Sequence, residues 1–310
     1  MFIRIGSTLQ RSLGRHYTTS TNAVSTTLKK PLLITAAGLC LLGSGYYSYE
    51  QNKKKGPQPL DPNAYVPLTL IKKEQISPDS YRLRLLTKQK MDYFPVPSCL
   101  YIKDDTIQVM RPYTPVNSDP YKDGYIDLVV KQYAGGSVSR TLSGFAPNDK
   151  VHVRGPMMEE YEYKENSVDE VGMIAGGTGI SPMYQLICRI LENPKDQTRI
   201  WLVYGNKTEQ DILLKAELDE LQEKHSDRLR VKYVLDNPPE NWTGGQGFIS
   251  QEMIKEMLGD EKKRLMVFVC GPNKMLGLVC GERARDYSQG QVTGILARLG
   301  LSSNEIWKFQ

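Results

Sequence analysis

The sequence predicts an N-terminal antiparallel β-barrel domain followed by a parallel α/β domain, with a single transmembrane helix before both. Three observations support this prediction. Short β-like segments punctuated by proline and glycine occupy residues 65–165. Strand-like and helix-like segments alternate over residues 166–310. An apolar stretch occupies residues 32–49. The length of 310 residues is sufficient for two domains, each with its own core.

Residues 1–30 have the character of a targeting segment. They contain no acidic residue, and Arg4, Arg11 and Arg15 fall on one face of a helix, opposite an apolar face. An acid-free amphipathic helix of this kind is typical of mitochondrial targeting segments. The alternative is a disordered tail whose spacing is accidental.

Residues 31–50 are predicted to form a membrane anchor. The 18-residue apolar stretch at 32–49 would span ~27 Å as a helix, marginally enough to cross a bilayer. Lysines flank both ends, at 29–30 and at 53–55. The alternatives are a secretory signal peptide or a buried helix. Residues 51–64 contain Gly56-Pro57-Gln58-Pro59 and are expected to be a linker.

Charge and reactive side chains exclude several function classes. The net charge of +5 divides into +7 over residues 1–55 and −2 over the remainder, which disfavours a nucleic-acid-binding body. The five cysteines are scattered and there are only three histidines. A disulfide framework, a metal site and a hydrolase triad are therefore poorly supported.

The body is expected to change from β to α/β structure near residue 166. In the first part, strands are expected at 67–76, 81–87, 98–103, 106–111, 124–133 and 150–154, with one helix at 137–143. In the second part, strands are expected at 171–176, 199–205, 228–236 and 264–271, and helices at 180–191, 209–224, 250–258 and 273–285. Strand–helix alternation of this kind indicates a parallel sheet with right-handed crossovers.

Two motifs in the first part could bind a phosphorylated, ring-containing molecule. In Arg111-Pro112-Tyr113-Thr114-Pro115, the arginine could hold a phosphate, and the tyrosine, on the same side of the strand, could lie against a planar ring. Gly135-Gly136 stands before a helix whose N-terminus would favour an anion. The alternatives are a proline-rich strand end and an ordinary helix start.

Three features of the second part lie where parallel strands end, which is where nucleotides bind. Residues 176–182, GGTGISP, form a glycine-rich turn, although the pattern differs from GxGxxG. Cys270-Gly271-Pro272 ends another strand. Asp236 could accept ribose hydroxyls and repel a 2′-phosphate, and no Lys or Arg follows it directly, which favours NADH over NADPH. The alternatives are a generic turn, a core cysteine and a turn aspartate.

The order of these motifs resembles that of the NADH–cytochrome b5 reductase family, within the ferredoxin-reductase-like flavoprotein superfamily. The resemblance covers residues 65–310. The N-terminal anchor and the tail from GILARLG (294–300) to Ile306-Trp307-Lys308-Phe309 are similar to the fungal mitochondrial branch. The matching segments are RPYTPV (111–116), DLVVKQY (127–133), VHVRGP (151–156), VGMIAGGTGISPMYQL (171–186), TEQDILLKAELDEL (208–221) and VCGPNKM (269–275).

The resemblance implies FAD and NADH as cofactors, with a flavin-binding barrel and a nucleotide-binding α/β domain. On the FAD side it implies Arg111, Pro112, Tyr113, Thr114, Val129, Lys131, Tyr133, Gly136, Val138, Ser139 and Ser181. On the NADH side it implies Gly177, Gly179, Asp236, Phe248, Gly271, Pro272 and Met275. The catalytic pair implied is Thr178, near the flavin, and Cys270, near the nicotinamide.

The activity implied is hydride transfer from NADH to FAD, followed by single-electron transfer to cytochrome b5 or a similar haem protein. The location implied is the mitochondrial outer membrane, with the intermembrane space as a second location. One alternative is a flavin reductase that serves a quinone or ferric acceptor without a haem partner. Another is an anchored scaffold that has kept the fold without the activity.

Overall fold

A computed structural model describes residues 57–104, 108–158, 161–259 and 263–309. The predicted targeting segment and membrane anchor lie outside these residues. Within them, every helix is too short or too polar to cross a bilayer. From its start near the linker, the described chain belongs to a single compact unit that runs to the C-terminus.

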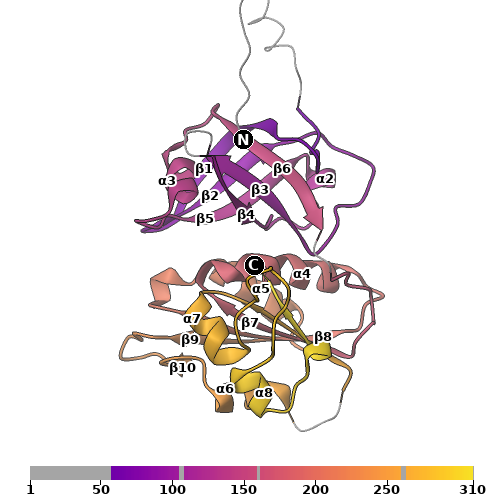
Figure 1. The fold of residues 1–310 in the computed structure, drawn as a ribbon, viewed down its shortest axis with the longest axis vertical. Helices are drawn as coiled ribbons and strands as arrows, with labels where there is room; N and C mark the ends of the chain where they lie inside the picture. Colours follow the sequence, from indigo (N-terminus) through magenta and orange to yellow (C-terminus); the bar gives the residue numbers. More distant parts are fainter. Residues whose placement is uncertain (1–56, 105–107, 159–160, 260–262, 310) are drawn as a thin grey trace, which may run out of the picture. The chain divides into compact units, whose positions relative to one another are not determined.

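The first part, called the β domain here, is a six-stranded antiparallel sheet with the order β4-β3-β6-β1-β2-β5 (Figure 1). Its elements are β1 (Val66–Ser77), β2 (Ser80–Leu86), β3 (Ser98–Asp104), β4 (Val109–Tyr113), α2 (Pro120–Asp123), β5 (Tyr125–Lys131), α3 (Ser137–Gly144) and β6 (Lys150–Met158). The predicted strands are confirmed where the chain is described, and the short helix α2 was not predicted.

The β domain is held together by alternate inward-facing side chains. Leu83 and Leu85 of β2 are buried, as are Ile126 and Leu128 of β5, which pair with them across the strands. Burial alternates along β3 as one apolar face of a sheet requires, whereas β5 is buried from Ile126 to Val130. β4 and β5 are the two edges of the sheet, so the predicted barrel is open between them.

The second part, called the α/β domain, is a six-stranded parallel sheet with the order β10-β9-β8-β7-β11-β12 (Figure 1). Its strands are β7 (Glu170–Gly176), β8 (Arg199–Asn206), β9 (Leu229–Leu235), β10 (Gly245–Gln246), β11 (Leu265–Cys270) and β12 (Ile306–Lys308). Its helices are α4 (Ile180–Glu192), α5 (Lys215–Lys224), α6 (Gln251–Leu258), α7 (Asn273–Val279) and α8 (Gly294–Arg298).

Helices cover both faces of this sheet, which explains why β7 is buried along its whole length. α4 and α5 pack in one apolar cluster, through residues such as Leu186 and Leu218. α6, α7 and α8 pack in another, through residues such as Ile254 and Leu276. The chain passes from β7 to β8 and β9 on one side, and β11 then lies on the other side of β7. The carboxyl end of β7 is therefore the switch point where nucleotides bind in such sheets.

Two predicted helices in this domain were too long. The segment 209–224 divides into a short 3-10 turn, η2 (Glu209–Asp211), and α5, because Leu214 adopts a left-handed backbone with φ 59. Leu213 and Leu214 bury their side chains in the core, and this burial outweighs the local helix propensity. α7 ends at Val279 rather than at 285, and Gly281, with φ +82, follows soon after. The short elements β10, α8 and β12 were not predicted.

The two domains share both apolar and polar contacts. Val116 and Val129 of the β domain belong to the same apolar cluster as α4 and β7. The polar contacts across the boundary include Ser98 N–H to Gln185 Oε1 at 3.0 Å, Arg189 Nη2 to Phe94 O at 2.7 Å, Lys131 Nζ to Asp211 Oδ1 at 2.8 Å, and Arg82 to Glu217. The domains therefore meet along the region where both sets of predicted site residues lie.

Candidate functional site

The end of β4 presents the first predicted motif. Arg111 and Tyr113 pair with Ile102 and Leu100 of β3, so both lie on one edge strand. The Arg111 side chain is exposed, and its Nη1 donates to the carbonyl of Met110 at 2.8 Å. Burial raises the pKa of Tyr113 to about 12, with opposing effects from Arg111, which lowers it, and Tyr133, which raises it. Arg111 and Tyr133 are therefore both within electrostatic range of the Tyr113 hydroxyl.

The opposite edge strand, β5, has backbone groups that face this neighbourhood. The N–H and C=O of Asp127 both point away from β2: the first donates to Asn117 Oδ1 at 2.9 Å and the second accepts from Val116 at 2.8 Å. Because backbone groups alternate along an antiparallel strand, those of Val129 and Lys131 point the same way. The Val129 side chain is buried, so this residue can meet a ligand only through its backbone.

The turn between β5 and α3 is compact. Tyr133 N–H donates to Ser139 Oγ at 3.3 Å, and Ser139 Oγ donates to the Gly136 carbonyl at 3.3 Å. A Cβ on Gly136 would lie 2.4 Å from Ser139 Oγ, so a larger residue there would displace this hydroxyl from its two hydrogen bonds. Val138 is buried and fixes the first turn of α3. No side chain caps α3, so its first N–H groups remain available to an anion.

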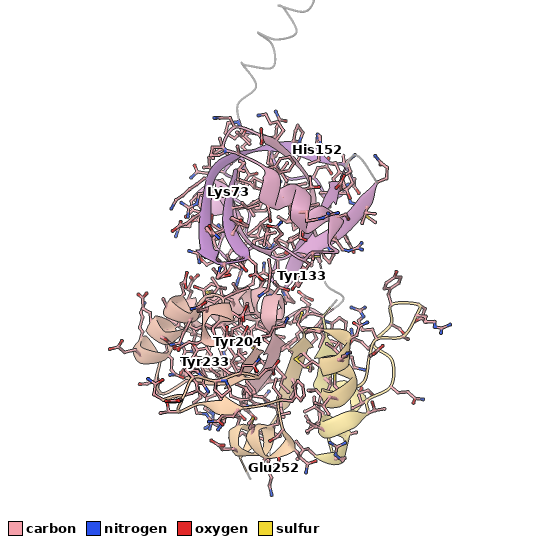
Figure 2. All side chains as sticks on the ribbon, turned by 90° about the vertical axis from the view of Figure 1, so that its left-hand side faces the viewer. Lys73, Tyr133, His152, Tyr204, Tyr233 and Glu252 are labelled. Atoms are coloured by element: carbon pink, nitrogen blue, oxygen red, sulfur yellow. The ribbon has the colours of Figure 1, made fainter. Side chains whose placement is uncertain are left out.

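The glycine turn of the α/β domain, η1 (Gly177–Gly179), meets Tyr133 directly. The Tyr133 hydroxyl lies 3.2 Å from Thr178 Oγ1, while the Tyr133 side chain remains 49% exposed (Figure 2). Gly177 has φ +54 and open space where a Cβ would stand. The hydroxyl of the buried Tyr204 donates to the Gly177 carbonyl at 3.0 Å and holds the turn in place. The two predicted motifs, 45 residues apart in the chain, are therefore in contact.

The end of β11 packs against the same turn. A Cβ on Gly179 would lie 2.2 Å from the Cys270 carbonyl oxygen, so the two backbones touch. The Cys270 side chain is buried, at 7% exposed. Gly271 lies against Met275, since a Cβ on Gly271 would come within 2.5 Å of the methionine Cε. Ser181, in the first turn of α4, is buried beside them, and Pro272 is exposed.

The remaining predicted residues continue along the same sheet edge. Asp236 follows β9, and its N–H donates to the Asn206 carbonyl at the end of β8, at 2.9 Å. Phe248 follows β10, is 77% exposed, and comes directly after Gly247, whose N–H donates to the Leu235 carbonyl. His152 lies toward the other end of the β domain from Tyr133 and takes no part in the site (Figure 2).

Two lysines of this region make contacts that the sequence analysis did not predict. Lys131 was expected to belong to the FAD site, and its ammonium group pairs with Asp211 at 2.8 Å and Asp79 at 3.3 Å, which leaves its backbone groups for a ligand. Burial works against the charge of Lys131, but these two carboxylates outweigh it and raise its pKa. Lys207, directly after β8, stands beside Asp236 and was not predicted. The ion pairs of Lys131 and the position of Lys207 beside Asp236 both join residues that are distant in the chain. A local sequence pattern does not indicate contacts of this kind.

Comparisons with known proteins agree with this geometry. Two family models match: the oxidoreductase FAD-binding domain over residues 67–163 and the oxidoreductase NAD-binding domain over residues 173–281. The chain is 39% identical to the NADH-cytochrome b5 reductase 2 of Aspergillus clavatus, over 95% of both chains. The chain belongs to the NADH-cytochrome b5 reductase family.

Other reductases of this family and fold are similar. The NADH-cytochrome b5 reductase 2 of Aspergillus fumigatus is 37% identical, over 99% of this chain and 98% of its own. The structure resembles that of the cytochrome b5 reductase domain of Ulva prolifera nitrate reductase, with a TM-score of 0.70 and 31% identity, over 81% of this chain and all of that one. The CS-b5R domains of human Ncb5or match with a TM-score of 0.65 and 26% identity, over 83% of this chain and 71% of that chain.

Proposed function

We propose that this protein oxidises NADH at the edge of the α/β sheet and passes the electrons, through FAD, to cytochrome b5 or a similar haem protein. The observation that carries the proposal is the contact between the Tyr133 hydroxyl and Thr178 Oγ1 at 3.2 Å. It joins the end of β5, in the FAD-binding domain, to the glycine turn at the switch point of the NAD-binding domain.

The residues of the β domain fit FAD. A flavin ring can accept and donate hydrogen bonds along its edge, and the outward backbone groups of Val129 and Lys131 supply such partners. Tyr113, with Pro112 and Thr114 on either side of it, would lie against the ring. Arg111 and the uncapped N-terminus of α3, with Gly136 and Ser139, would hold the two phosphates. Bound FAD would take a hydride from NADH and release electrons one at a time.

The residues of the α/β domain fit the dinucleotide. Gly177 leaves the backbone bare, so a cofactor can approach closely, and Gly179 lets the turn lie directly against the end of β11. Thr178 and Cys270 would act as catalytic residues by position: Thr178 Oγ1 would hold the ring edge, and Cys270 would set the distance to the nicotinamide. Neither residue needs to give or take a proton. Asp236 would accept the ribose hydroxyls, and the exposed Phe248 would cover the bound dinucleotide.

We also propose that residues 1–30 direct the chain to the mitochondrion and that residues 31–50 anchor it in the outer membrane. The support is the sequence: an acid-free amphipathic segment followed by an 18-residue apolar stretch between lysines. Fractionation of mitochondria, with protease protection and carbonate extraction, tests both parts. Recovery of the chain in the soluble fraction after carbonate treatment would contradict the anchor.

The proposed electron acceptor is tested with the purified full chain. NADH oxidation is measured with cytochrome b5, with a ubiquinone analogue and with a ferric chelate, each over a range of concentrations. We expect the highest kcat/KM with cytochrome b5. A protein that reduces the quinone or the chelate efficiently and cytochrome b5 only slowly would instead support the alternative flavin reductase.

A further inference from the structure

Lys207 lies directly beside Asp236 at the carboxyl edge of the α/β sheet. In the parallel register of β8 and β9, Asn206 is opposite Leu235, so the next residue of each strand, Lys207 and Asp236, continues the same alignment. Two backbone hydrogen bonds hold Lys207 and Asp236 in this alignment. Asp236 N–H donates to the Asn206 carbonyl at 2.9 Å, and Asn237 N–H donates to the Lys207 carbonyl at 2.8 Å. Adjacent parallel strands are ~4.8 Å apart, so the two side chains start from neighbouring positions.

The positive charge of Lys207 influences the Asp236 carboxylate, although the two side chains form no ion pair among the described residues. Burial raises the pKa of Asp236, and Lys207 partly opposes that effect, so the two groups are within electrostatic range. Lys207 is exposed and takes no part in the ion pairs found among the described residues. The nearby carboxylate of Asp211 already pairs with Lys131. The ammonium group of Lys207 can therefore turn toward an anion at this edge.

We propose that Lys207 binds the 2′-phosphate of NADPH at the ribose position beside Asp236, so that the protein uses NADPH as a second electron donor. This inference rests on the proposed function. Asp236 alone would repel a 2′-phosphate, because both carry negative charge. A cation on the adjacent strand supplies the opposite charge where the extra phosphate would lie. Asp236, with no Lys or Arg directly after it in the sequence, by itself favours NADH over NADPH.

The ammonium group could also contact the pyrophosphate, which NADH and NADPH share. The two possibilities differ in what they predict for each donor. A contact with the 2′-phosphate affects NADPH alone, whereas a contact with the pyrophosphate affects both donors equally. The ratio of kcat/KM for the two donors therefore separates them.

The test is Lys207→Gln in the full-length holoenzyme, with kcat/KM measured for NADH and for NADPH at low salt. We expect kcat/KM for NADPH to fall roughly five- to tenfold, the scale of a charged hydrogen bond at a half-open site, and the value for NADH to change less than about twofold. The matched control is Lys232→Gln, on β9, whose ammonium group pairs with Glu256 at 2.6 Å. We expect it to change neither value.

A binding measurement supplies a readout that does not depend on turnover. Calorimetry with adenosine 2′,5′-bisphosphate should show about five- to tenfold weaker binding to the Lys207→Gln variant, and ADP should bind both proteins equally. Equal losses for both ligands, or no loss for either, would overturn the inference. If the wild-type protein fails to oxidise NADH, the proposed function fails, while the calorimetric comparison still decides the role of Lys207.

Discussion

Replacing Gly179 with alanine tests the close contact between the glycine turn and β11. The backbone of Gly179 has φ −62, which alanine adopts without strain, so the effect of the substitution is steric. The new Cβ would stand 2.2 Å from the Cys270 carbonyl oxygen, and real Cβ atoms essentially never come within 3.0 Å of another heavy atom. The backbone must therefore move by about 0.8 Å or more. β11 cannot yield easily, because it is paired on both sides.

A displacement of this size moves Thr178 and Cys270 relative to each other. Misplacement by about 1 Å typically costs roughly 100-fold in rate, and overpacking costs about 1–3 kcal/mol of unfolding free energy. We expect both effects, with FAD still bound because the residues that would hold its phosphates lie in the β domain. Stopped-flow reduction by NADH gives the rate, and urea denaturation gives the free energy.

The matched control is Gly277→Ala in α7, where the new Cβ would meet its nearest neighbour at an ordinary 3.8 Å. It should leave the rate unchanged and stabilise the helix by roughly 0.5–1 kcal/mol. A Gly179→Ala enzyme with the wild-type rate and stability would refute the reasoning, since it would mean that the turn does not touch β11.

Three further predictions concern the contacts around the site. A double-mutant cycle on Lys131→Ala and Asp211→Ala should give a coupling of about 1 kcal/mol in unfolding free energy. Burial would raise the pKa of Asp211, but Lys131 lowers it overall, so the coupling should be complete well above pH 3.8 and be lost as the pH falls below that value. A coupling that survives at pH 2 would contradict this prediction. Tyr133→Phe removes one hydroxyl contact with Thr178 and should slow flavin reduction by less than about tenfold in stopped flow; a loss of 100-fold would show a chemical role for the hydroxyl. Cys270→Ser should slow flavin reduction and leave the FAD absorbance of the purified protein intact, whereas loss of FAD would show that the residue lies elsewhere.

Most long elements of the fold could be predicted from the sequence because their signals are local. The run at 171–176 is apolar throughout, as expected for a strand with helices on both faces, and β7 is buried along its length. The break before α5 could not be predicted, because Leu213 and Leu214 leave the helix to fill a core that forms from distant segments. β12 depends in the same way on pairing with β11, about forty residues earlier.

In the candidate site, as in the fold, local sequence patterns predict some residues, while contacts between residues distant in the chain could not be predicted. The residues that carry it were predicted, since glycines and prolines at strand ends are visible in the sequence. Their partners were not, because they come from other parts of the chain. The ion pair of Lys131 with Asp211 crosses between the domains, and the position of Lys207 beside Asp236 depends on the register of two strands. The donor preference predicted from Asp236 takes no account of Lys207 for this reason.

The most direct test of the whole account is the absorbance of the purified full chain during an anaerobic titration with NADH, followed by addition of oxidised cytochrome b5. We predict a yellow protein with one FAD per chain, bleached by one equivalent of NADH and recoloured as the cytochrome becomes reduced. A colourless protein that does not take up added FAD, or a flavin that NADH leaves oxidised, would contradict the claim that both cofactors meet at Tyr133 and Thr178.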